Sequence, residues 1–566
     1  MGIWNLYFAA KLYLFAIGQV QPRWLLNLLF ALWLVLPVEH RGLRVLRQVL
    51  AVVVGVALLY HESNLPPFAR VASQFSNLSA FTPAYLLELL QRFVSPQMVL
   101  GAIVVTLAYL VINRWVRVTT FVLLALVVVP LWQGAGTAST GAAATGAAAT
   151  RAAQRPAPTM RIDSPAEVGD NEAQLNAFRT QEASRQVAFT PLSASPDSQF
   201  DIIVLHVCSL SWDDLDVAKA RNHPLLSRFD YLFTEFSSAA SYSGPAAIRL
   251  LRATCGQQPH QALYSPAQAQ CHLFEALAQA GFDTRVLMNH DGRFDNFRGF
   301  VDKEIGIPNV THVPVDGVPP AMRAFDNSPI LGDYAVLEKW YKSRLAQNSG
   351  PLALYYNTVT LHDGNRLPDS KLTSIQSYPL RLTRLLDDID KLIALIAQSG
   401  RKAVVVFVPE HGAALRGDAN QIAGMREIPT PRIVHVPVGV KLIGLQGGNA
   451  GGEVGGNAGG IAGRGSAGGN AGGNAAGNAA GNAQGNGNGG GGPVTIHAPS
   501  SYLALSQLLS NLVADSPFRQ GAPAPSQYAA DLPQTRMVGE NEATVMMKRG
   551  TGYVVRTPDG VWVDGK

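Results

Sequence analysis

The chain has 566 residues, 47% of them hydrophobic, and its 45 basic and 40 acidic residues leave a formal net charge of +5. Part of this small basic excess lies in two short loops near the amino terminus, so the charge balance does not indicate a nucleic-acid-binding protein, and we expect no nucleic-acid partner. The length leaves room for a membrane segment and a large folded domain.

Residues 1–133 are dominated by apolar stretches of about 15 to 20 residues, close to the length that an α-helix needs to cross a bilayer. No small-residue cleavage site separates the first stretch from the second, which argues against a cleaved signal peptide. We expect an all-α transmembrane anchor of four or five helices. The apolar stretches are 4–20, 24–38, 45–60, 98–112 and 118–132.

Basic residues predict the orientation of this anchor. Arg41, Arg44 and Arg47 lie between the second and third stretches, and Arg114 and Arg117 lie between the fourth and fifth. Loops rich in Arg stay on the cytoplasmic side of a membrane. Five spans would place the amino terminus inside and the rest of the chain outside. We therefore expect a multi-pass protein of the bacterial inner membrane with a periplasmic carboxyl-terminal domain.

Two low-complexity segments mark the boundaries beyond the anchor. Residues 134–160 are rich in Gly and Ala and predict a flexible tether to a catalytic domain at 161–566. Residues 446–492 repeat Gly, Asn and Ala without the regular aspartates of a calcium-binding repeat, which predicts a disordered insertion. The last residues, with Gly-rich turns between Val- and Tyr-rich runs, predict a β-hairpin or meander.

Four strand-like runs, at 200–207, 284–288, 352–356 and 402–409, end at polar side chains. Helical patterns separate them, the clearest at 379–398. This order predicts a doubly wound, parallel α/β sheet, which holds its chemistry at the carboxyl ends of its strands. The side chains that follow the four runs are Cys208, Asn289 with His290, His362, and Glu410 with His411.

Three cysteines follow the apolar stretches. An oxidising compartment favours an even number of paired cysteines. Cys255 and Cys271, sixteen residues apart in a loop-like segment, are the natural pair. Cys208 is left over: it is either a small buried residue at a strand end or a thiolate ligand, which would suit zinc.

Residues 241–245 read Ser-Tyr-Ser-Gly-Pro and precede a helix-like run. Ser243 or Gly244 is expected to cap this helix, with Pro245 in the first turn, and capping alone would explain a serine here. A helix amino terminus also attracts phosphate. A serine at that position, beside a metal that lowers its pKa, is a competent nucleophile for phosphoryl transfer.

With these residues assembled, the chain resembles the alkaline-phosphatase superfamily and, more closely, the bacterial cellulose phosphoethanolamine transferases of the BcsG family. The resemblance covers nearly the whole chain. Lipid A phosphoethanolamine transferases, which are relatives, use threonine as nucleophile, Glu as first ligand and a later Asp-His pair. This chain has serine, cysteine and Glu-His there, which favours the cellulose branch. The matching segments are 207–212, 241–246, 251–256, 289–292, 361–364 and 409–417.

The resemblance implies an alkaline-phosphatase-like periplasmic domain that transfers phosphoethanolamine from phosphatidylethanolamine to glucosyl 6-hydroxyls of nascent cellulose, with cellulose synthase subunits as partners. It implies that Cys208, Glu410 and His411 hold Zn²⁺ and that Ser243 forms a phosphoethanolamine-serine intermediate. His362 would protonate the leaving oxygen and deprotonate the acceptor, unless it is a structural histidine.

Three further residues, Tyr242, His290 and Arg426, are weaker candidates for binding phosphate or ethanolamine, and Arg426 reads equally well as a solvated surface arginine. His206 is expected to be merely packed. Other readings of the chain remain open: another phosphoethanolamine or phosphoglycerol transferase, a hydrolase, or a scaffold subunit of a cellulose synthase complex. A sulfatase is disfavoured because its Cys-x-Pro-Ser-Arg signature is absent.

Overall fold

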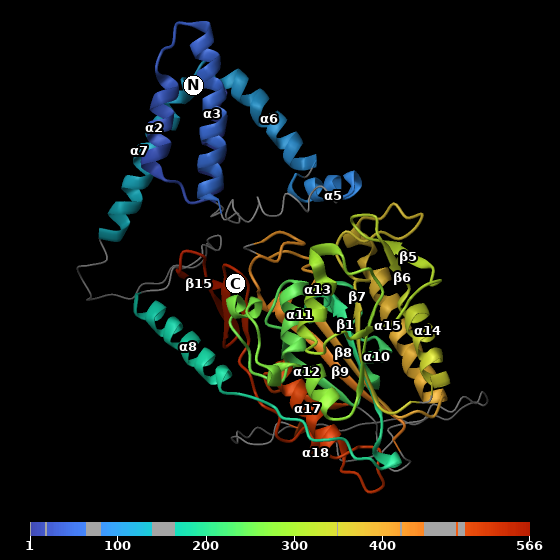
Figure 1. Cartoon of the computed structure of the whole chain (residues 1–566). Helices are drawn as coiled ribbons and strands as arrows, with labels where there is room; N and C mark the ends of the chain where they lie inside the picture. Colours follow the sequence, from blue (N-terminus) through green and yellow to red (C-terminus); the bar gives the residue numbers. More distant parts are fainter. Residues whose placement is uncertain are drawn as a thin grey trace, which may run out of the picture. The chain divides into compact units, whose positions relative to one another are not determined.

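The computed structural model describes residues 2–16, 20–63, 81–94, 96–138, 165–347, 349–418, 421–445, 483–484 and 493–565. The chain divides into two compact units, Met1–Arg161 and Ile162–Lys566 (Figure 1). Helix α7 (Val118–Ala138) extends into the tether expected at 134–160, and strand β10 (Ala483–Gln484) falls within the insertion expected at 446–492, so at these residues the expectation of unstructured chain was wrong. The rest of both segments lies outside the described residues and remains a prediction.

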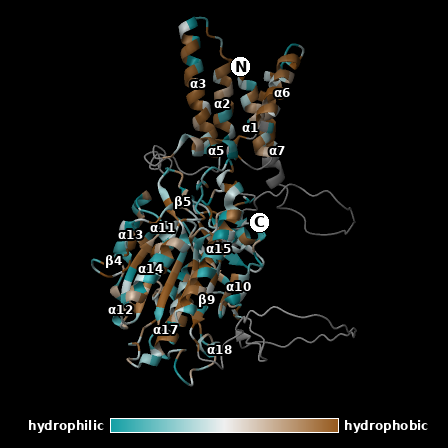
Figure 2. Cartoon of the chain, turned by 90° about the vertical axis from the view of Figure 1, so that its right-hand side faces the viewer, coloured by the Kyte–Doolittle hydropathy of each residue, from teal (hydrophilic) through white to brown (hydrophobic). Residues whose placement is uncertain are grey.

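Helices make up most of the described part of the first unit, and hydrophobic residues dominate them (Figure 2). Large apolar side chains remain exposed along these helices. Each of the five apolar stretches overlaps one helix, and α5 was not predicted. Among the described residues, α3 alone is long and apolar enough to cross a bilayer, and α5 with α6, bent by 59°, would be a second span if counted as one. The helices are α1 (Trp4–Ala16), α2 (Trp24–Val35), α3 (Arg41–Glu62), α5 (Pro83–Phe93), α6 (Pro96–Ile112) and α7 (Val118–Ala138).

The second unit is built on a nine-stranded sheet of order β10-β11-β2-β9-β8-β1-β7-β3-β4. The four strand-like runs of the sequence become β1, β3, β7 and β8, which are adjacent and parallel. The predicted α/β class is confirmed. The strands are β1 (Asp201–Cys208), β2 (Tyr231–Ser237), β3 (Asp283–Met288), β4 (Thr311–His312), β7 (Leu352–Thr358), β8 (Ala403–His411), β9 (His435–Ile443), β10 (Ala483–Gln484) and β11 (Val494–Ile496).

One central strand departs from the parallel order expected. Strand β9 runs antiparallel to both of its neighbours, β8 and β2. In the described part of the chain between β8 and β9, residues 412–418 and 421–434, the only helix or strand is the short helix α16 (Pro431–Val434). The amide of Gly412 bonds to the carbonyl of Ile433 at 2.7 Å. This connection starts and ends at the carboxyl edge of β8, so β9 must run back from that edge, since a parallel return needs a crossover.

Helices cover both faces of the sheet, so β1 is buried on both faces. Ile202 and Val204 pack into one hydrophobic cluster, and Ile203, Leu205 and Val207 pack into another, since successive side chains point to opposite faces. The helices of the first cluster are α11 (Ser243–Leu251), α12 (Leu273–Gln279), α13 (Phe297–Glu304) and α17 (Tyr502–Ala514). Those of the second are α9 (Trp212–Val217), α10 (Pro224–Arg228), α14 (Asp333–Gln347) and α15 (Ser374–Gln398).

Helix α15 contains the predicted 379–398 and starts earlier, because Thr373 and Gln376 form a capping box. The predicted meander is confirmed as a four-stranded antiparallel sheet. Its Trp562 packs against Leu175 and Phe178. The remaining elements are α8 (Pro165–Ala183), α18 (Pro525–Tyr528), β5 (Pro320–Arg323), β6 (Pro329–Leu331), β12 (Val538–Glu540), β13 (Val545–Arg549), β14 (Gly552–Arg556) and β15 (Trp562–Gly565).

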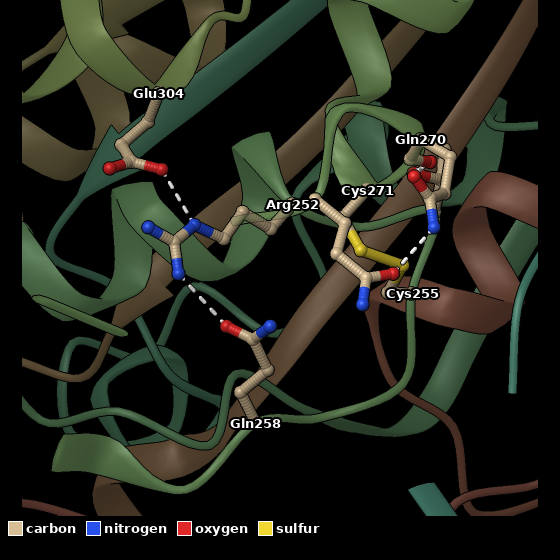
Figure 3. The surroundings of a disulfide bond; sticks show 8 residues. Arg252, Cys255, Gln258, Gln270, Cys271 and Glu304 are labelled. Atoms are coloured by element: carbon tan, nitrogen blue, oxygen red, sulfur yellow. Dashed lines mark hydrogen bonds and ion pairs between the residues drawn. A yellow bond between two sulfur atoms is a disulfide. The ribbon is translucent and has the colours of Figure 1, made fainter. Parts of the chain in front are cut away.

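A disulfide joins Cys255 and Cys271, the pair expected from the sequence. Beside it, Arg252 forms a buried ion pair with Glu304 and donates to Gln258 (Figure 3). The disulfide therefore closes the segment that follows α11 and fixes the carboxyl end of that helix.

Replacing both Cys255 and Cys271 by serine is expected to lower the free energy of unfolding by about 3 kcal/mol, because the cross-link restricts a short loop of the unfolded chain. Urea denaturation followed by tryptophan fluorescence measures this loss. The unsubstituted chain under reducing conditions should lose the same amount. An unchanged denaturation midpoint would contradict the prediction.

Candidate metal centre and nucleophile

Three candidate ligands meet at the carboxyl edge of the sheet. Cys208 ends β1 and His411 ends β8, and these two residues are paired across the two parallel strands. Glu410 precedes His411. All three are fully buried, and one ligand atom from each lies within 4.8 Å of the others. Neighbouring parallel strands therefore bring together residues that are about 200 positions apart in the chain.

These residues fit a bound Zn²⁺. Thiolate, carboxylate and imidazole are the ligand types that zinc prefers. Glu410 Oε2 is buried without a hydrogen-bond partner and lies 3.9 Å from His411 Nε2. The ring of His411 donates from Nδ1 to the carbonyl of Gly412 at 2.9 Å, which leaves the Nε2 lone pair for a metal. A cation between these atoms would satisfy the carboxylate oxygen, which is otherwise costly to bury.

The electrostatics of the site also favour a cation. Burial raises the pKa of Glu410 to about 7. Burial and, to a smaller extent, the charge of Glu410 raise the pKa of the Cys208 thiol above its ordinary value. Two acidic groups thus share a site from which water is excluded, and a bound cation would reverse both shifts.

Ser243 lies beside the three ligands, with its Oγ 3.2 Å from Cys208 Sγ and 3.4 Å from His411 Nε2. Helix α11 begins at Ser243 itself, and the cap position belongs to Tyr242, which has extended backbone and makes no side-chain capping bond. The expectation that Ser243 or Gly244 caps the helix was therefore wrong. The Ser243 hydroxyl faces the ligands at the amino-terminal end of α11, where partial positive charge favours phosphate.

Space for a substrate adjoins this hydroxyl. A Cβ added to Gly244 would meet nothing within 4 Å. Tyr242, Ser243 and Gly244 are half-buried, whereas the ligands beneath them are fully buried. The nucleophile candidate is therefore reached from outside, and the metal centre lies behind it.

Arg426 and Tyr242 flank the same site. The guanidinium of Arg426 lies 3.4 Å from His411 Nδ1 and 3.5 Å from the hydroxyl of Ser209. It also lies 5.5 Å from the centre of the Tyr242 ring. Arg426 is thus half-buried against the site and is not a solvated surface arginine. Its position suits an anionic group approaching Ser243.

His362 follows β7 and has one ring nitrogen engaged. Its Nδ1 donates to the carbonyl of Asp363 at 2.7 Å, so Nε2 carries the lone pair. Burial, followed by the charge of Arg426, lowers the pKa of His362 to about 4. The imidazole is therefore neutral near pH 7, the form that accepts a proton.

His290 lies farther from the ligands. Its Nε2 donates to Asn357 Oδ1 at 2.8 Å, and its Nδ1 accepts from the amide of Gly292 at 3.1 Å. Both ring nitrogens are thus used within the chain. Asn357 in turn donates to Glu410 Oε1 at 2.7 Å. The structure places His290 behind Asn357, where it orients the residue that orients Glu410.

Sequence reasoning missed Asn357 and undervalued His206. These two residues are paired across β1 and β7. His206 is packed, as expected, yet its Nδ1 lies 3.6 Å from Glu410 Oε1, and burial lowers its pKa to about 3. A polar residue near the carboxyl end of an otherwise apolar buried strand was the available signal, because such residues are buried only with a partner.

Replacing Asn357 by leucine is expected to weaken zinc binding by about 10- to 100-fold, because Glu410 loses the donor that orients it. Competition with a chelator of known affinity measures the change. Asn365→Leu, at a nearby buried amide that bonds only to backbone carbonyls of residues 359 and 360, is the matched control. Equal zinc affinity in Asn357→Leu and the unsubstituted chain would refute the orienting role.

Two family models match the chain. Residues 156–455 and 483–562 match the family described as "Cellulose biosynthesis protein BcsG C-terminal domain", and residues 4–131 match "Cellulose biosynthesis protein BcsG N-terminal domain". The protein named cellulose biosynthesis protein BcsG from Salmonella typhimurium is 37% identical over 99% of this chain and 95% of its own length. Its namesake from Escherichia coli is 36% identical over the same shares.

Solved structures are more distantly similar. A protein of the alkaline phosphatase superfamily from Vibrio parahaemolyticus is 12% identical, with a TM-score of 0.44 over 69% of this chain and 87% of its own. The integral membrane protein lipooligosaccharide phosphoethanolamine transferase A from Neisseria meningitidis is 14% identical, with a TM-score of 0.37 over 77% of this chain and 88% of its own. The match of both BcsG domains and the identity along the whole length show that the chain belongs to the BcsG family of cellulose biosynthesis proteins.

Proposed function

We propose that this chain transfers phosphoethanolamine from phosphatidylethanolamine to glucosyl 6-hydroxyls of cellulose through a covalent phosphoethanolamine-serine intermediate. The observation that carries the proposal is the position of the Ser243 hydroxyl, 3.2 Å from Cys208 Sγ at the amino-terminal end of α11. Membership of a family named for cellulose biosynthesis supports the acceptor.

In this proposal Cys208, Glu410 and His411 hold Zn²⁺. When bound, the ion supplies positive charge that lowers the pKa of a neighbouring hydroxyl and stabilises phosphoryl oxygens. The helix amino terminus and Arg426 add fixed positive potential where the phosphoryl group would lie. These groups share one edge of the sheet, so the charge that develops in the transition state meets a preorganised environment.

The reaction has two steps. The Ser243 hydroxyl loses its proton to a base, its oxygen attacks phosphorus, the bond from phosphorus to the glycerol oxygen breaks, and diacylglycerol leaves with that proton. The 6-hydroxyl of a glucosyl unit then loses its proton to the base and attacks the same phosphorus, and the displaced Ser243 oxygen takes up that proton. His362 is the proposed base, because its Nε2 carries a lone pair and its imidazole is neutral near pH 7.

The cellular setting is part of the same proposal. The large unit would lie in the periplasm of a bacterial inner membrane, where the donor lipid and the emerging polymer meet, beside subunits of a cellulose synthase complex. Support comes from α3, which is long and apolar enough to span a bilayer, and from the arginines at its first turns.

The acid limb of the pH–rate profile is expected near pH 4 and not near 6.5, the ordinary value for histidine, because burial and Arg426 lower the pKa of His362 to about 4. A base works only when unprotonated, so the rate falls as the pH drops through the lowered pKa. Arg426→Gln removes a positive charge and should move the limb toward 6.5. Zinc content measured at each pH separates this effect from loss of metal.

A limb near 6.5 in the unsubstituted chain, or a limb unmoved by Arg426→Gln, would contradict base catalysis by a His362 with a lowered pKa.

The central test uses the full chain in lipid nanodiscs with phosphatidylethanolamine labelled in its ethanolamine carbons. Label should accumulate on Ser243 when acceptor is absent and should move to cello-oligosaccharide when acceptor is added. Label retained by Ser243→Ala, or no label on the unsubstituted chain, would sink the proposal. Normal cellulose output with no phosphoethanolamine in cells carrying Ser243→Ala would separate transfer from a scaffold role.

A further inference from the structure

The proposed donor headgroup has two charges, and the groups assigned to the site can bind only the negative one. Phosphoethanolamine carries an anionic phosphoryl group and a cationic ammonium group separated by two methylene carbons. Arg426, the helix amino terminus and the metal site are suited to the anion. The ammonium needs an acidic or aromatic partner close to Ser243, and this requirement rests on the proposed function.

Glu427 is an acidic residue whose side chain contacts Tyr242, the residue before the proposed nucleophile. Tyr242 OH donates to Glu427 Oε1 at 2.6 Å, and Tyr242 directly precedes Ser243. The ring of Tyr242 also lies under the guanidinium of Arg426, at 5.5 Å. Arg426 thus lies over the ring of Tyr242 and Glu427 lies at its hydroxyl, so opposite charges contact two parts of the tyrosine that precedes the nucleophile.

The backbone of Glu427 is fixed from behind by the carboxyl-terminal meander. Its carbonyl accepts from Asn541 Nδ2 at 2.6 Å and from Thr544 Oγ1 at 2.8 Å. The next residue, Ile428, exchanges two hydrogen bonds with the side chain of Gln421, at 2.8 and 3.1 Å. The backbone that carries the carboxylate is therefore held in place before any substrate arrives, as a selective site requires.

Both Arg426 and Glu427 are half-buried. A charge pair formed with a ligand in such a position is partly shielded from water, so it discriminates more strongly than a pair on an open surface.

We propose that Glu427 binds the ammonium group of the donor and selects phosphoethanolamine over headgroups that lack a positive charge. The phosphoryl group lies on the Arg426 and Ser243 side of Tyr242, and the ammonium lies on the Glu427 side. A phosphoglycerol donor offers no charge to this carboxylate, so Glu427 distinguishes the proposed reaction from phosphoglycerol transfer.

The test compares two soluble nitrophenyl phosphodiesters, one with an aminoethyl group and one with a propyl group of similar size. The full chain in nanodiscs should prefer the aminoethyl ester by about 30-fold in kcat/KM, the strength of a hydrogen bond between charged groups. Glu427→Gln keeps an oxygen that accepts from Tyr242 and loses the charge. It should reduce the preference to about three-fold or less, because kcat/KM falls more for the aminoethyl ester than for the propyl ester.

Glu542→Gln is the matched control, because Glu542 is an exposed acid in the meander turn that holds the backbone of Glu427. This variant should retain the preference. A preference that survives in Glu427→Gln overturns the assignment, and so does an equal loss for both esters, which would mean that Glu427 only positions Tyr242. If the unsubstituted chain cleaves neither ester and forms no labelled Ser243, the proposed function itself fails.

Discussion

Ser243→Ala is expected to lower kcat/KM for phosphoethanolamine transfer by at least about 1,000-fold and to abolish the covalent intermediate, because the variant lacks the proposed attacking oxygen. The hydroxyl lies within 3.4 Å of two candidate metal ligands, so alanine leaves the attacking atom missing while the ligands remain. Zinc content should therefore stay near that of the unsubstituted chain. The two measurements together separate loss of the nucleophile from collapse of the site.

Label transfer from phosphatidylethanolamine to cello-oligosaccharide, followed by mass spectrometry of both products, measures this effect. Ser227→Ala, at an exposed serine on α10 that bonds to its own helix, is the control and should transfer at the normal rate. Transfer by Ser243→Ala within about ten-fold of normal would show that the chemistry does not pass through a serine ester.

Cys208→Ala is expected to weaken zinc binding by more than about 100-fold, a larger effect than that of changing a residue that only orients a ligand. The thiolate is one of three proposed protein ligands, and its removal would leave Glu410 and His411 as a two-ligand site. Activity should fall with zinc content, and added zinc should restore neither at micromolar concentrations.

Elemental analysis after dialysis against a weak chelator measures the zinc that remains, with about one ion per chain expected for the unsubstituted protein. The double variant Cys255→Ser with Cys271→Ser is a demanding control, since it removes two sulfur atoms and should keep the metal. If Cys208→Ala retained zinc, Cys208 would not be a ligand. It would instead be a small buried residue at the end of a strand.

The buried parallel strands could be predicted from the sequence because burial on both faces determines the residue types within each strand. A strand covered on both faces is apolar at every position, and β1 and β8 are buried along their whole lengths. The polar side chains that end such runs are therefore conspicuous, which is how Cys208, Glu410 and His411 were found. The disulfide pair was predicted from the number of cysteines and from the short separation of Cys255 and Cys271.

Contacts between different strands and loops could not be predicted, because the sequence of one strand does not show which segment packs beside it. The pairing of His206 with Asn357 depends on the register of β1 against β7, and the reversed β9 depends on a loop that stays at one edge. The cap was expected at Ser243 or Gly244, but the helix begins at Ser243 and Tyr242 holds the cap position.

The amino-acid sequence by itself determined the α/β class, the ligand types and the candidate nucleophile, since residue chemistry and apolar periodicity are properties of short segments. Only the tertiary structure decided that Ser243 faces the ligands, that Asn357 orients Glu410, and that Glu427 is held against Tyr242 by residues of the distant meander. Those relations join segments far apart in the chain, and packing alone brings them into contact.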